Sequence, residues 1–571
     1  MVVLGISAYY HDSAAALIVD GKVVAAICEE RLSRKKHDSS FPKRAIEFCV
    51  EQGKITYSEI NYVVFYEKPF RKFERILTSH IYHAPKGLKT FVKSMPIWLK
   101  ERLNMKSTIA KSLNEIFHTK IDWDIRFLDH HLSHAAMSYY TSPFEKAAVL
   151  VVDAVGENAT TSIYKADDYK IDCIKQQCFP NSVGLLYSAF TYFLGFEVNS
   201  DEYKVMGLAP YGDLQDEQTK RFINIIKNKL VAIDEDGGII INQKYFTYMV
   251  GLRMVDKKMW AKLFGFVKRE ADEPVKPEHQ NLAAAIQYVT EEILLRLANH
   301  TKAVTQCNNL CIAGGCALNC AAMGKIKMSG VFDNVFIPFA PGDDGAAIGA
   351  ALAFYSIVSS TRSLQGVSPY QGCCFESEDI EKAIREEGLK YDLVAEDELY
   401  NSVAASLSRG NIIGWFQGRM EFGPRALGNR SILADPREVS MKDRINARVK
   451  YREGFRPFAP VVTEDDALKF FEDEKSPFMM STTLVRKGVT SIPAVTHVDR
   501  TARVQTVTEL SNKHLYRLLK AFERYSDIPI LLNTSFNIMG EPIVCTPQDA
   551  IKTYKGSGID ILVINNYIIK K

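Results

Sequence analysis

The stretch Val2-Val-Leu-Gly-Ile-Ser-Ala-Tyr-Tyr-His-Asp-Ser-Ala-Ala-Ala-Leu-Ile-Val-Asp-Gly-Lys-Val-Val-Ala-Ala-Ile-Cys28 alternates apolar runs with short polar turns. The runs at 2–8, 14–20 and 23–28 predict three strands, joined by a polar turn at 9–13 and a hairpin turn at 21–22. Residues 147–164 repeat the order of strand, polar turn and strand. This repetition predicts two related halves that face a cleft, with a ligand expected beyond the strand ends.

The duplicated layout is typical of the actin-like ATPase and sugar-kinase (ASKHA) class, and it predicts an α/β domain over residues 1–360. Within this domain, residues 66–120 look helical, residues 214–280 look like an insertion, and residues 280–304 repeat apolar side chains at helical spacing. The polar stretch 360–372 is the expected domain boundary. Strands expected at 411–416, 529–533 and 559–566 predict a second α/β domain over 373–571.

Composition restricts the functional class. The 571 residues are 47% hydrophobic and 24% charged, with a net charge of +3, which favours neither nucleic acid nor an acidic membrane as a partner. The eleven cysteines form no CxxC pair, so neither a zinc ribbon nor a disulfide framework is expected. No signal peptide and no apolar run of about 18 residues is evident, so we expect a cytoplasmic protein without a membrane span.

The segment Asp129-His-His-Leu-Ser-His134 indicates a metal site. His130 and His134 are four residues apart, which places both imidazoles on one face of a helix. A buried-type strand ends at Asp153, and another acid, Asp344, lies in the turn at 341–345. Imidazoles with carboxylates form a mixed set of ligands suited to a catalytic metal. The spacing alone also suits two surface or capping histidines, His131 could replace His130, and Asp344 could simply cap a helix.

Two glycine-containing turns favour nucleotide binding in the first domain. Lys204 precedes Gly207, and Gly314-Gly315 follows a strand and precedes Asn319. Glycine lets the backbone approach a ligand closely, and a helix start can offer free N–H groups to phosphate. The alternative is that each glycine only forms a tight turn.

The second domain contains a group of cationic side chains among glycines and prolines. Guanidinium groups bind phosphate oxygens in pairs, so these loops are predicted to bind anions. The cations are Arg419, Arg425, Arg430, Arg437, Arg448, Lys450, Arg452 and Arg456. Ser535 and Asn537 follow a predicted strand and are expected to act as donors, although Ser-x-Asn also forms ordinary turns.

Several motifs in one order resemble the NodU/CmcH/TobZ carbamoyltransferases, and the resemblance covers essentially the whole chain. The motifs are His11-Asp-Ser-Ala-Ala-Ala16, Glu29-Glu-Arg-Leu-Ser-Arg-Lys-Lys-His37, Asp129-His-His-Leu-Ser-His134, Lys204-Val-Met-Gly-Leu-Ala-Pro-Tyr-Gly212, Gly314-Gly-Cys-Ala-Leu-Asn319, Gly342-Asp-Asp-Gly-Ala-Ala347, Gly423-Pro-Arg-Ala-Leu-Gly-Asn-Arg-Ser431 and Asn533-Thr-Ser-Phe-Asn537. The resemblance implies a first domain similar to TsaD, the metal-binding protein of the tRNA threonylcarbamoyl enzymes, and a YrdC-like second domain.

The resemblance also implies a two-step reaction. Carbamoyl phosphate and ATP, with Mg²⁺, would form carbamoyl adenylate in the YrdC-like domain. The carbamoyl group would then pass to a hydroxyl of a small molecule beside Fe(II) or another divalent metal. A Lewis-acid metal suits the oxyanion that forms during carbamate transfer.

Residue roles follow from the same resemblance. The metal positions are His130, His134, Asp153 and Asp344, and His11 lies next to the acceptor as the candidate general base. Lys450 and Arg456 are predicted to act in catalysis, and Arg419, Arg425, Arg452, Ser535 and Asn537 in nucleotide or phosphate binding. The alignment leaves open which of Arg448, Lys450, Arg452 and Arg456 fills which position.

Composition and motifs also bear on three other functions. A tRNA threonylcarbamoyl-type enzyme is disfavoured because the charge offers no basic stripe for tRNA. A hydrogenase-maturation carbamoyltransferase would carry cysteine-rich zinc modules, which this sequence lacks. A catalytically inert nucleotide-binding regulator would not require the complete set of metal-ligand residues and arginines, so the presence of that set disfavours this function. The expected partner is a small molecule with a hydroxyl group that accepts the carbamoyl group, and a homodimer is one expected assembly. Residues 66–102, with Tyr82, Phe91 and Trp98, are expected either to form a wall of the acceptor pocket or to be an ordinary helical insertion.

Overall fold

A computed structural model describes residues 1–97, 104–362, 366–473 and 475–571. The chain forms two compact units. The first contains Met1–Tyr9, Ala14–Val24 and Phe41–Val367, and the second contains Tyr10–Ser13, Ala25–Ser40 and Ser368–Lys571. The sequence predicts a boundary over residues 360–372, but it gives no sign that 10–13 and 25–40 group with the second unit. Trp98 lies outside the described residues.

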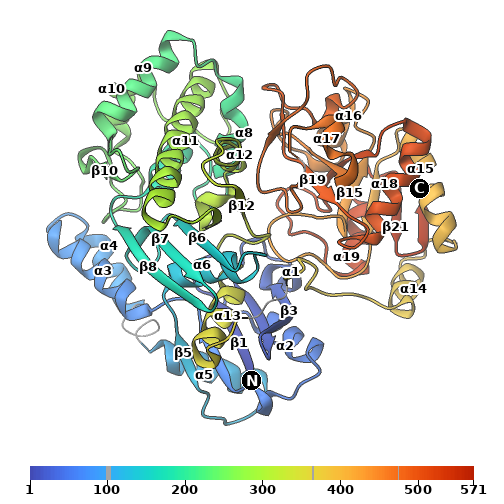
Figure 1. The fold of residues 1–571 in the computed structure, drawn as a ribbon, viewed down its shortest axis with the longest axis horizontal. Coiled ribbons are helices and arrows are strands. Elements are labelled where there is room, and N and C mark those ends of the chain that lie inside the picture. Colours follow the sequence, from blue (N-terminus) through green and yellow to red (C-terminus); the bar gives the residue numbers. More distant parts are fainter. Residues whose placement is uncertain (98–103, 363–365, 474) are drawn as a thin grey trace. The chain divides into compact units, whose positions relative to one another are not determined.

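The first unit contains two five-stranded sheets with the same topology (Figure 1). One has the order β3-β2-β1-β4-β5 and the other β8-β7-β6-β11-β12. In each, the first two strands pair antiparallel, and the last two strands add in parallel on the other side of the first strand. This confirms the predicted duplication and the actin-like α/β class. The strands are β1 Val2–Ser7, β2 Ala14–Val19, β3 Lys22–Cys28, β4 Tyr62–Phe65, β5 Ile125–Phe127, β6 Lys146–Val152, β7 Ala159–Asp167, β8 Lys170–Cys178, β11 Asn309–Ala313 and β12 Asn334–Phe336.

One helix follows the last strand of each sheet, and these two helices pack against each other. α6 (His130–Tyr140) follows β5, and α13 (Ala346–Ser359) follows β12. Their close approach depends on Gly349 of α13, because a Cβ there would lie 1.9 Å from the carbonyl oxygen of Ser133. On β1, a Cβ at Gly5 would lie 2.0 Å from the carbonyl oxygen of Ala347. Small residues thus seat α13 between α6 and β1, which fixes the position of α6.

The remaining helices of the first unit follow the sequence patterns. The predicted helix over 280–304 is confirmed as α11 (Pro277–Thr305), and the helical character of 66–120 as α3 (Pro69–Tyr82), α4 (Leu88–Ile97) and α5 (Met105–Ile116). The insertion contains α9 (Glu217–Ile225), α10 (Lys257–Phe264) and a hairpin of β9 (Val231–Ile233) with β10 (Ile239–Ile241). The further α-helices of the described part of this unit are α2 (Lys43–Gln52), α7 (Val183–Phe193), α8 (Glu202–Leu208) and α12 (Cys320–Met328).

The second unit is built on an eight-stranded mixed sheet with the order β13-β22-β21-β14-β15-β20-β16-β19. The three predicted strands are confirmed as β14 (Ile413–Phe416), β20 (Ile530–Ser535) and β21 (Ile561–Ile564). The other strands are β13 Asp392–Leu393, β15 Arg430–Ala434, β16 Ala459–Thr463, β19 Gln505–Val507 and β22 Tyr567–Lys570. Helices α14 (Ser377–Glu386), α15 (Glu396–Ser408), α18 (Lys513–Ser526) and α19 (Pro547–Lys555) contribute apolar side chains to the core of this unit.

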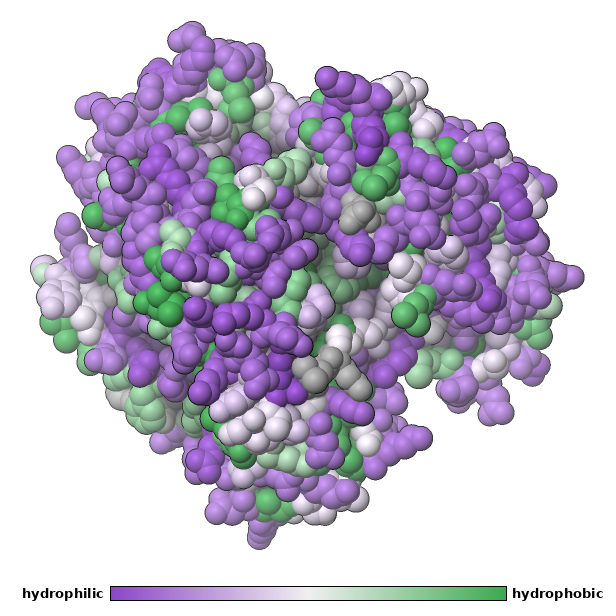
Figure 2. All heavy atoms as spheres, viewed as in Figure 1, coloured by the Kyte–Doolittle hydropathy of each residue, from purple (hydrophilic) through white to green (hydrophobic). Residues whose placement is uncertain are grey.

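Hydrophilic side chains dominate the face drawn in Figure 2, where apolar residues form small separate areas. Among the described residues, no helix has the length and apolar character needed to cross a membrane.

Candidate metal centre and anion site

The start of α6 is stabilised by a carboxylate. Asp129 has an extended backbone and precedes the helix, and both oxygens of Glu157 accept the N–H of His130, at 3.0 and 3.2 Å. Glu157 Oε1 also accepts the backbone N–H of Lys68 at 2.8 Å. A helix start leaves its first N–H groups without intrahelical partners and favours negative charge, so Glu157 fixes the first turn of α6. The sequence pattern did not reveal this role, although Glu157 follows the strand that ends at Asp153.

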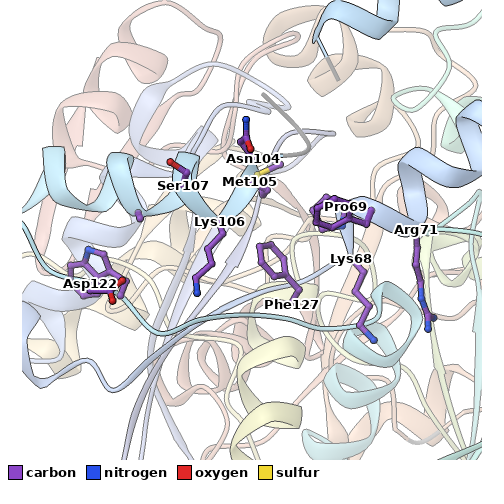
Figure 3. A pocket seen from close by; sticks show the side chains of 12 residues that line it. Lys68, Pro69, Arg71, Asn104, Met105, Lys106, Ser107, Asp122 and Phe127 are labelled. Carbon is purple, nitrogen blue, oxygen red and sulfur yellow. The ribbon is translucent and has the colours of Figure 1, made fainter. Parts of the chain in front are cut away.

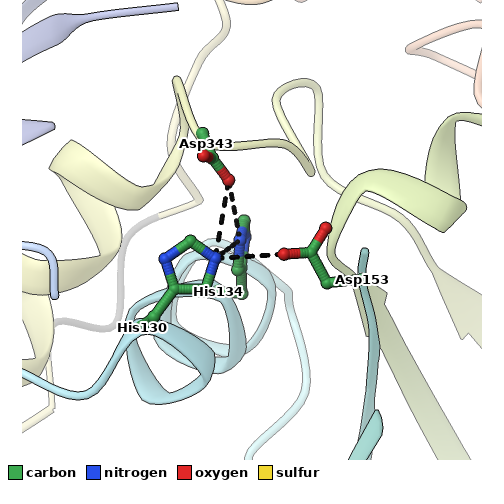
Figure 4. A group of neighbouring side chains, drawn as sticks. All are labelled: His130, His134, Asp153 and Asp343. Carbon is green, nitrogen blue, oxygen red and sulfur yellow. Dashed lines mark hydrogen bonds and ion pairs between the residues drawn. The ribbon is translucent and has the colours of Figure 1, made fainter. Parts of the chain in front are cut away.

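Four buried side chains converge at the first turns of α6 (Figure 4). His130 Nε2 lies 3.1 Å from Asp153 Oδ2 and 3.1 Å from His134 Nε2. Asp343 Oδ1 lies 3.3 Å from His134 Nε2 and 3.6 Å from His130 Nε2. Two atoms that bind one ion at about 2.1 Å are roughly 3.0 to 3.4 Å apart in octahedral or tetrahedral geometry. The four atoms therefore have about the separation of ligands that share one metal ion.

The structure distinguishes the two neighbouring histidines and corrects one predicted carboxylate of the cluster. His131 Nδ1 lies 2.7 Å from Ser162 Oγ, so His131 faces β7, and His130 is the member of the doublet that joins the cluster. The fourth residue of the cluster is Asp343, where the sequence predicts Asp344. Asp344 Oδ1 instead accepts the N–H of Gly345 at 2.9 Å. Consecutive residues in a turn direct their side chains differently, and a doublet of identical residues cannot reveal which one faces the site.

The two predicted nucleotide glycines support Asp153. The N–H of Gly315 donates to Asp153 Oδ1 at 3.0 Å, which leaves Oδ2 for His130. Gly314 has a φ of +89°, and a Cβ there would lie 2.3 Å from the carbonyl oxygen of Val152. Only glycine accommodates both this conformation and this contact, so the turn acts as a support for a ligand side chain.

Electrostatics distinguish the histidines. Burial alone lowers the pKa of His130, but Asp343 and Asp153 outweigh it and raise that pKa to about 9. Burial and the neighbouring His130 lower the pKa of His131 to about 3, so His131 is neutral. For Asp153, burial raises the pKa, but hydrogen bonding to His130 and the charge of His134 outweigh burial and bring it well below 3.8. A cation at this position is therefore strongly favoured, whether a proton or a metal ion.

The donor set fits a divalent transition metal. Two imidazoles and two carboxylates match the preferences of iron, zinc or manganese better than those of a structural thiolate site. The Nδ1 atoms of His130 and His134 are buried and have no hydrogen-bond partner among the described residues, whereas their Nε2 atoms point into the cluster. The side chains are thus directed at the shared space by their Nε2 atoms.

The other residues predicted for nucleotide binding in the first unit have structural contacts. Lys204 on α8 forms an ion pair with Asp201 at 3.0 Å, and Gly207 is buried in the same helix. Asn319 Oδ1 accepts the N–H of Ala322 at the start of α12, and its amide pairs with that of Gln287 at 3.0 Å. These contacts are all within the protein. Nucleotide binding by Lys204, Gly207 and Asn319 therefore stays a prediction.

In the second unit, the chain brings together Lys450, Ser535 and Asn537. The ammonium of Lys450 donates to Asn537 Oδ1 at 2.7 Å, to the Asn537 carbonyl at 3.0 Å and to Ser535 Oγ at 3.2 Å. Burial lowers the pKa of Lys450 well below 10.5, and the charges of Arg452, Arg456 and Lys36 add to that effect. A buried cation with neutral acceptors and cationic neighbours is stabilised by a bound anion.

The arginines predicted to bind phosphate have three kinds of surroundings. Arg419 donates to the carbonyls of Gln371 at 2.7 Å and Gly372 at 3.3 Å, and so stabilises the backbone at residues 371–372. Arg452 donates to Asn446 Oδ1 at 2.8 Å, and Arg456 pairs with Glu453 at 3.5 Å. These two arginines lie around Lys450, whereas Arg425 is half-buried in the loop between β14 and β15.

His11 belongs to a carboxylate-linked pair of histidines in the second unit. His11 Nδ1 lies 2.9 Å from Asp12 Oδ2, and His37 Nδ1 lies 2.8 Å from Asp12 Oδ1. The backbone N–H of His37 donates to Glu30 Oε2 at 2.9 Å, which holds the second histidine. His11 and His37 lie in motifs evident in the sequence, but the contact of Asp12 with His37 across 25 positions required the fold.

Comparisons with known proteins are consistent across the chain. The model described as "Carbamoyltransferase N-terminus" matches residues 2–352, and that described as "Carbamoyltransferase C-terminus" matches residues 404–571. An uncharacterised protein of Synechocystis sp. is 44% identical, over 100% of this chain and 96% of that protein. Nodulation protein NolNO of Sinorhizobium fredii is 36% identical, over 99% of this chain and 79% of that protein.

A third relative and one solved structure complete the comparisons. The 3'-hydroxymethylcephem-O-carbamoyltransferase of Streptomyces clavuligerus is 34% identical, over 51% of this chain and 54% of that enzyme. Component A of the (R)-2-hydroxyglutaryl-CoA dehydratase of Acidaminococcus fermentans is 13% identical, over 63% of this chain and 99% of that chain, with a TM-score of 0.33. That score is too low to support any argument.

Proposed function

The chain belongs to the carbamoyltransferase family, and from this premise we propose that it is an ATP-dependent O-carbamoyltransferase acting on a small-molecule hydroxyl. Two relatives named 3'-hydroxymethylcephem-O-carbamoyltransferase support transfer of a carbamoyl group to an oxygen atom as the type of reaction. The observation that carries the proposal is the convergence of two imidazoles and two carboxylates at the start of α6 in a chain of this family.

The proposed metal ligands are His130, His134, Asp153 and Asp343. A divalent ion held there, Fe(II) by the family resemblance, would supply Lewis-acid stabilisation of the oxyanion that develops on the carbamoyl group. The protein's own contribution is to fix the donors: Gly315 orients Asp153, and Glu157 anchors the first turn that carries His130.

The proposed first half-reaction uses Lys450 and its surroundings. With Mg²⁺, water would first hydrolyse carbamoyl phosphate to carbamate and phosphate. The carbamate oxygen would then attack the α-phosphorus of ATP and displace pyrophosphate, which gives carbamoyl adenylate. The ammonium of Lys450, with Arg452 and Arg456 around it, supplies positive charge for clustered phosphates. Ser535 and Asn537 hold Lys450 in place and offer further polar groups. Arg425 is proposed to contact the same anions.

In the proposed transfer step, His11 acts as the general base. A neutral imidazole whose Nδ1–H donates to a carboxylate has its lone pair on Nε2. Asp12 provides that carboxylate at 2.9 Å, so Nε2 of His11 is the atom that would take the proton of the acceptor hydroxyl. His37 binds the second oxygen of Asp12 and keeps it in position.

The test is pyrophosphate release by the purified full-length protein. We expect release that requires both ATP and carbamoyl phosphate, and needs no other protein. Lys450→Ala should abolish it, whereas Lys469→Ala, a matched change at a side chain that is 67% exposed, should not. ATP-dependent release without carbamoyl phosphate, or no release from the parent protein, would contradict the proposed chemistry.

A further inference from the structure

The first unit has a cavity of about 740 Å³ between the starts of α3 and α5 and strand β5 (Figure 3). Lys68 and Arg71 line it, but both are paired with Asp129, at 2.5 and 3.1 Å. Figure 3 shows both side chains directed away from Lys106. Tyr82, one of the aromatic residues expected in a pocket wall, is 81% exposed and does not line this cavity. The described residues of the lining therefore form no anion site.

The second unit contains a buried ion pair that has no role in the reaction as described so far. Glu30 and Arg31 are neighbours in α1 (Glu29–Ser33), and they are only 8% and 4% exposed. Arg31 Nη1 donates to Glu30 Oε1. Burial of two opposite charges costs free energy unless further hydrogen bonds satisfy both groups. The other contacts of these two side chains therefore indicate what the pair does.

From Glu30, hydrogen bonds lead to the proposed general base. Glu30 Oε2 accepts the backbone N–H of His37 at 2.9 Å. His37 Nδ1 lies 2.8 Å from one oxygen of Asp12, and the other oxygen lies 2.9 Å from His11 Nδ1. The hydrogen bond to Asp12, together with the charges of Asp12 and Glu30, raises the pKa of His37 against the opposing effect of burial. A continuous series of polar contacts thus connects the Glu30 carboxylate with His11.

The backbone of this network is held in an uncommon conformation. Asp12 and His37 have φ angles of +51° and +53°, in the left-handed region that residues other than glycine seldom adopt. Such conformations persist where surrounding contacts stabilise them. The N–H of Ser13 donates to the carbonyl of Asp38 at 2.9 Å, and the N–H of Glu29 donates to the carbonyl of Ser13 at 2.8 Å. These bonds hold the two chain segments in the arrangement that places Asp12 between the histidines.

From Arg31, a hydrogen bond leads to the loop that carries Arg425. Arg31 Nη2 donates to the carbonyl of Gly423 at 2.9 Å. On the other side of Arg425 in the chain, the N–H of Leu427 donates to Glu421 Oε1 at 2.8 Å. Arg425 therefore lies between two fixed points of its loop, and Arg31 supplies one of them.

From these contacts we propose that Glu30 and Arg31 are positioning residues for carbamoyl transfer. Glu30 keeps Asp12 in the place that holds the proton of His11 on Nδ1, and Arg31 joins this network to the loop of Arg425. The inference rests on the proposed roles of His11 and Arg425, and it adds the residues that place them relative to each other. A phosphate group bound by the loop thereby affects the general base.

The first measurement is ¹⁵N NMR of the full-length protein labelled at its 12 histidines, which reports the ring nitrogen that carries the proton. Spectra of His11→Ala and His37→Gln assign the two signals. In the parent at pH 8.5, we expect neutral His11 with its proton on Nδ1 alone. Glu30→Gln should convert this signal to a mixture of both tautomers. Glu509→Gln, at a side chain that is 55% exposed, is the matched control and should leave the signal unchanged.

A second variant guards against unfolding. Glu30→Gln leaves the buried charge of Arg31 without its carboxylate partner, which is costly. The double variant Glu30→Gln, Arg31→Gln removes both charges together and should show the same mixture of His11 tautomers. Unchanged signals of the histidines other than His11 and His37 show that each variant is folded. A merely structural role of the ion pair would not alter the tautomer of His11 in a folded protein.

The second measurement adds Mg²⁺ and ATP, without carbamoyl phosphate, to the same samples. We expect ATP to shift the His11 signal in the parent and in Glu509→Gln. The shift should be lost in Arg31→Lys, because an ammonium keeps the charge beside Glu30 but lacks the planar fork that also reaches Gly423. A shift of equal size in Arg31→Lys, or no shift in the parent, would overturn the link through Arg31.

Pyrophosphate release by the parent protein is measured on the same preparation. If the parent releases pyrophosphate while His11 keeps its single tautomer in both Glu30→Gln and the double variant, the positioning role of Glu30 alone is overturned. If the parent releases none while the His11 signal changes as expected, the proposed carbamoyl transfer is overturned, and the contacts of Glu30 with the histidine pair are supported.

Discussion

Two neighbouring aspartates before α13 have different surroundings, and this difference can be tested at single residues. Asp343 Oδ1 lies 3.3 Å from His134 Nε2, while Asp344 Oδ1 accepts the N–H of Gly345. We predict that Asp343→Asn and His134→Ala lower metal affinity by about 10- to 100-fold or more, and that Asp344→Asn retains metal. Metal content after dialysis against a weak chelator checks this. Retention by Asp343→Asn together with loss by Asp344→Asn would assign the ligand role to Asp344.

The pair of His37 and Asp12 predicts a pH dependence of stability. Its hydrogen bond to Asp12 raises the pKa of His37, while for Asp12 burial raises the pKa and the bonds from His11 and His37 outweigh burial and lower it. The His37 contribution is therefore present below an unfolded pKa of about 6.5 and is lost as pH rises through the raised folded value. The Asp12 contribution is present above about 3.9 and is lost as pH falls through the depressed folded value.

His37→Gln tests this dependence. The variant should be less stable than the parent by about 0.5 to 1 kcal/mol near pH 5.5, since the pair is partly exposed. The difference should shrink at alkaline pH, where the parent's imidazole is also neutral. Urea denaturation at pH 5.5 and pH 9 measures it, and a difference that grows at pH 9 would argue against a charged His37 in the folded protein.

At the scale of elements, the close packing of α6 and α13 sets the positions of the histidines. A Cβ at Gly349 would lie 1.9 Å from the carbonyl oxygen of Ser133, so Gly349→Ala must displace one helix. We predict a loss of about 1–3 kcal/mol in the free energy of unfolding, with reduced metal content because α6 carries both imidazoles. Thermal unfolding and metal analysis measure these effects.

Gly366→Ala is the matched control, because among the described residues nothing beyond its chain neighbours lies within 4 Å of a Cβ there. It should leave both the melting temperature and the metal content unchanged. Equal behaviour of the two variants would show that the contact at Gly349 is relieved without movement of α6.

At the scale of the whole molecule, we predict that substitutions separate the two half-reactions, although Lys450, Arg425 and His11 all lie in the second unit. Lys450→Ala or Arg425→Ala should abolish pyrophosphate release, because both residues are proposed phosphate contacts. His11→Ala should still release pyrophosphate but fail to transfer the carbamoyl group to an acceptor. Both activities are measured on one preparation of each protein. Loss of pyrophosphate release in His11→Ala, with retention in Lys450→Ala, would mean that the steps have been assigned to the wrong residues.

Sequence alone determined the features that depend on local pattern. The repeated strand and turn order at 2–28 and 147–164 predicted the duplicated sheets, and apolar spacing predicted α11. The four-residue spacing of His130 and His134 placed both imidazoles on one helical face, because helix geometry fixes that relation without any other part of the chain. Arginines among glycines and prolines predicted an anion site, because the charge of a guanidinium group depends on residue type and not on the rest of the fold.

Only the tertiary structure decided which distant groups meet. Lys450 reaches Ser535 across 85 positions, Gly315 orients Asp153 across 162, and the segments 10–13 and 25–40 join the second unit. The fold also brings Asp343 and His130, and not Asp344 or His131, into the cluster. Such choices depend on where turns direct side chains and on how strands align after long chain reversals. Local pattern predicts elements and residue types, whereas the packing of those elements selects the atoms that form a site.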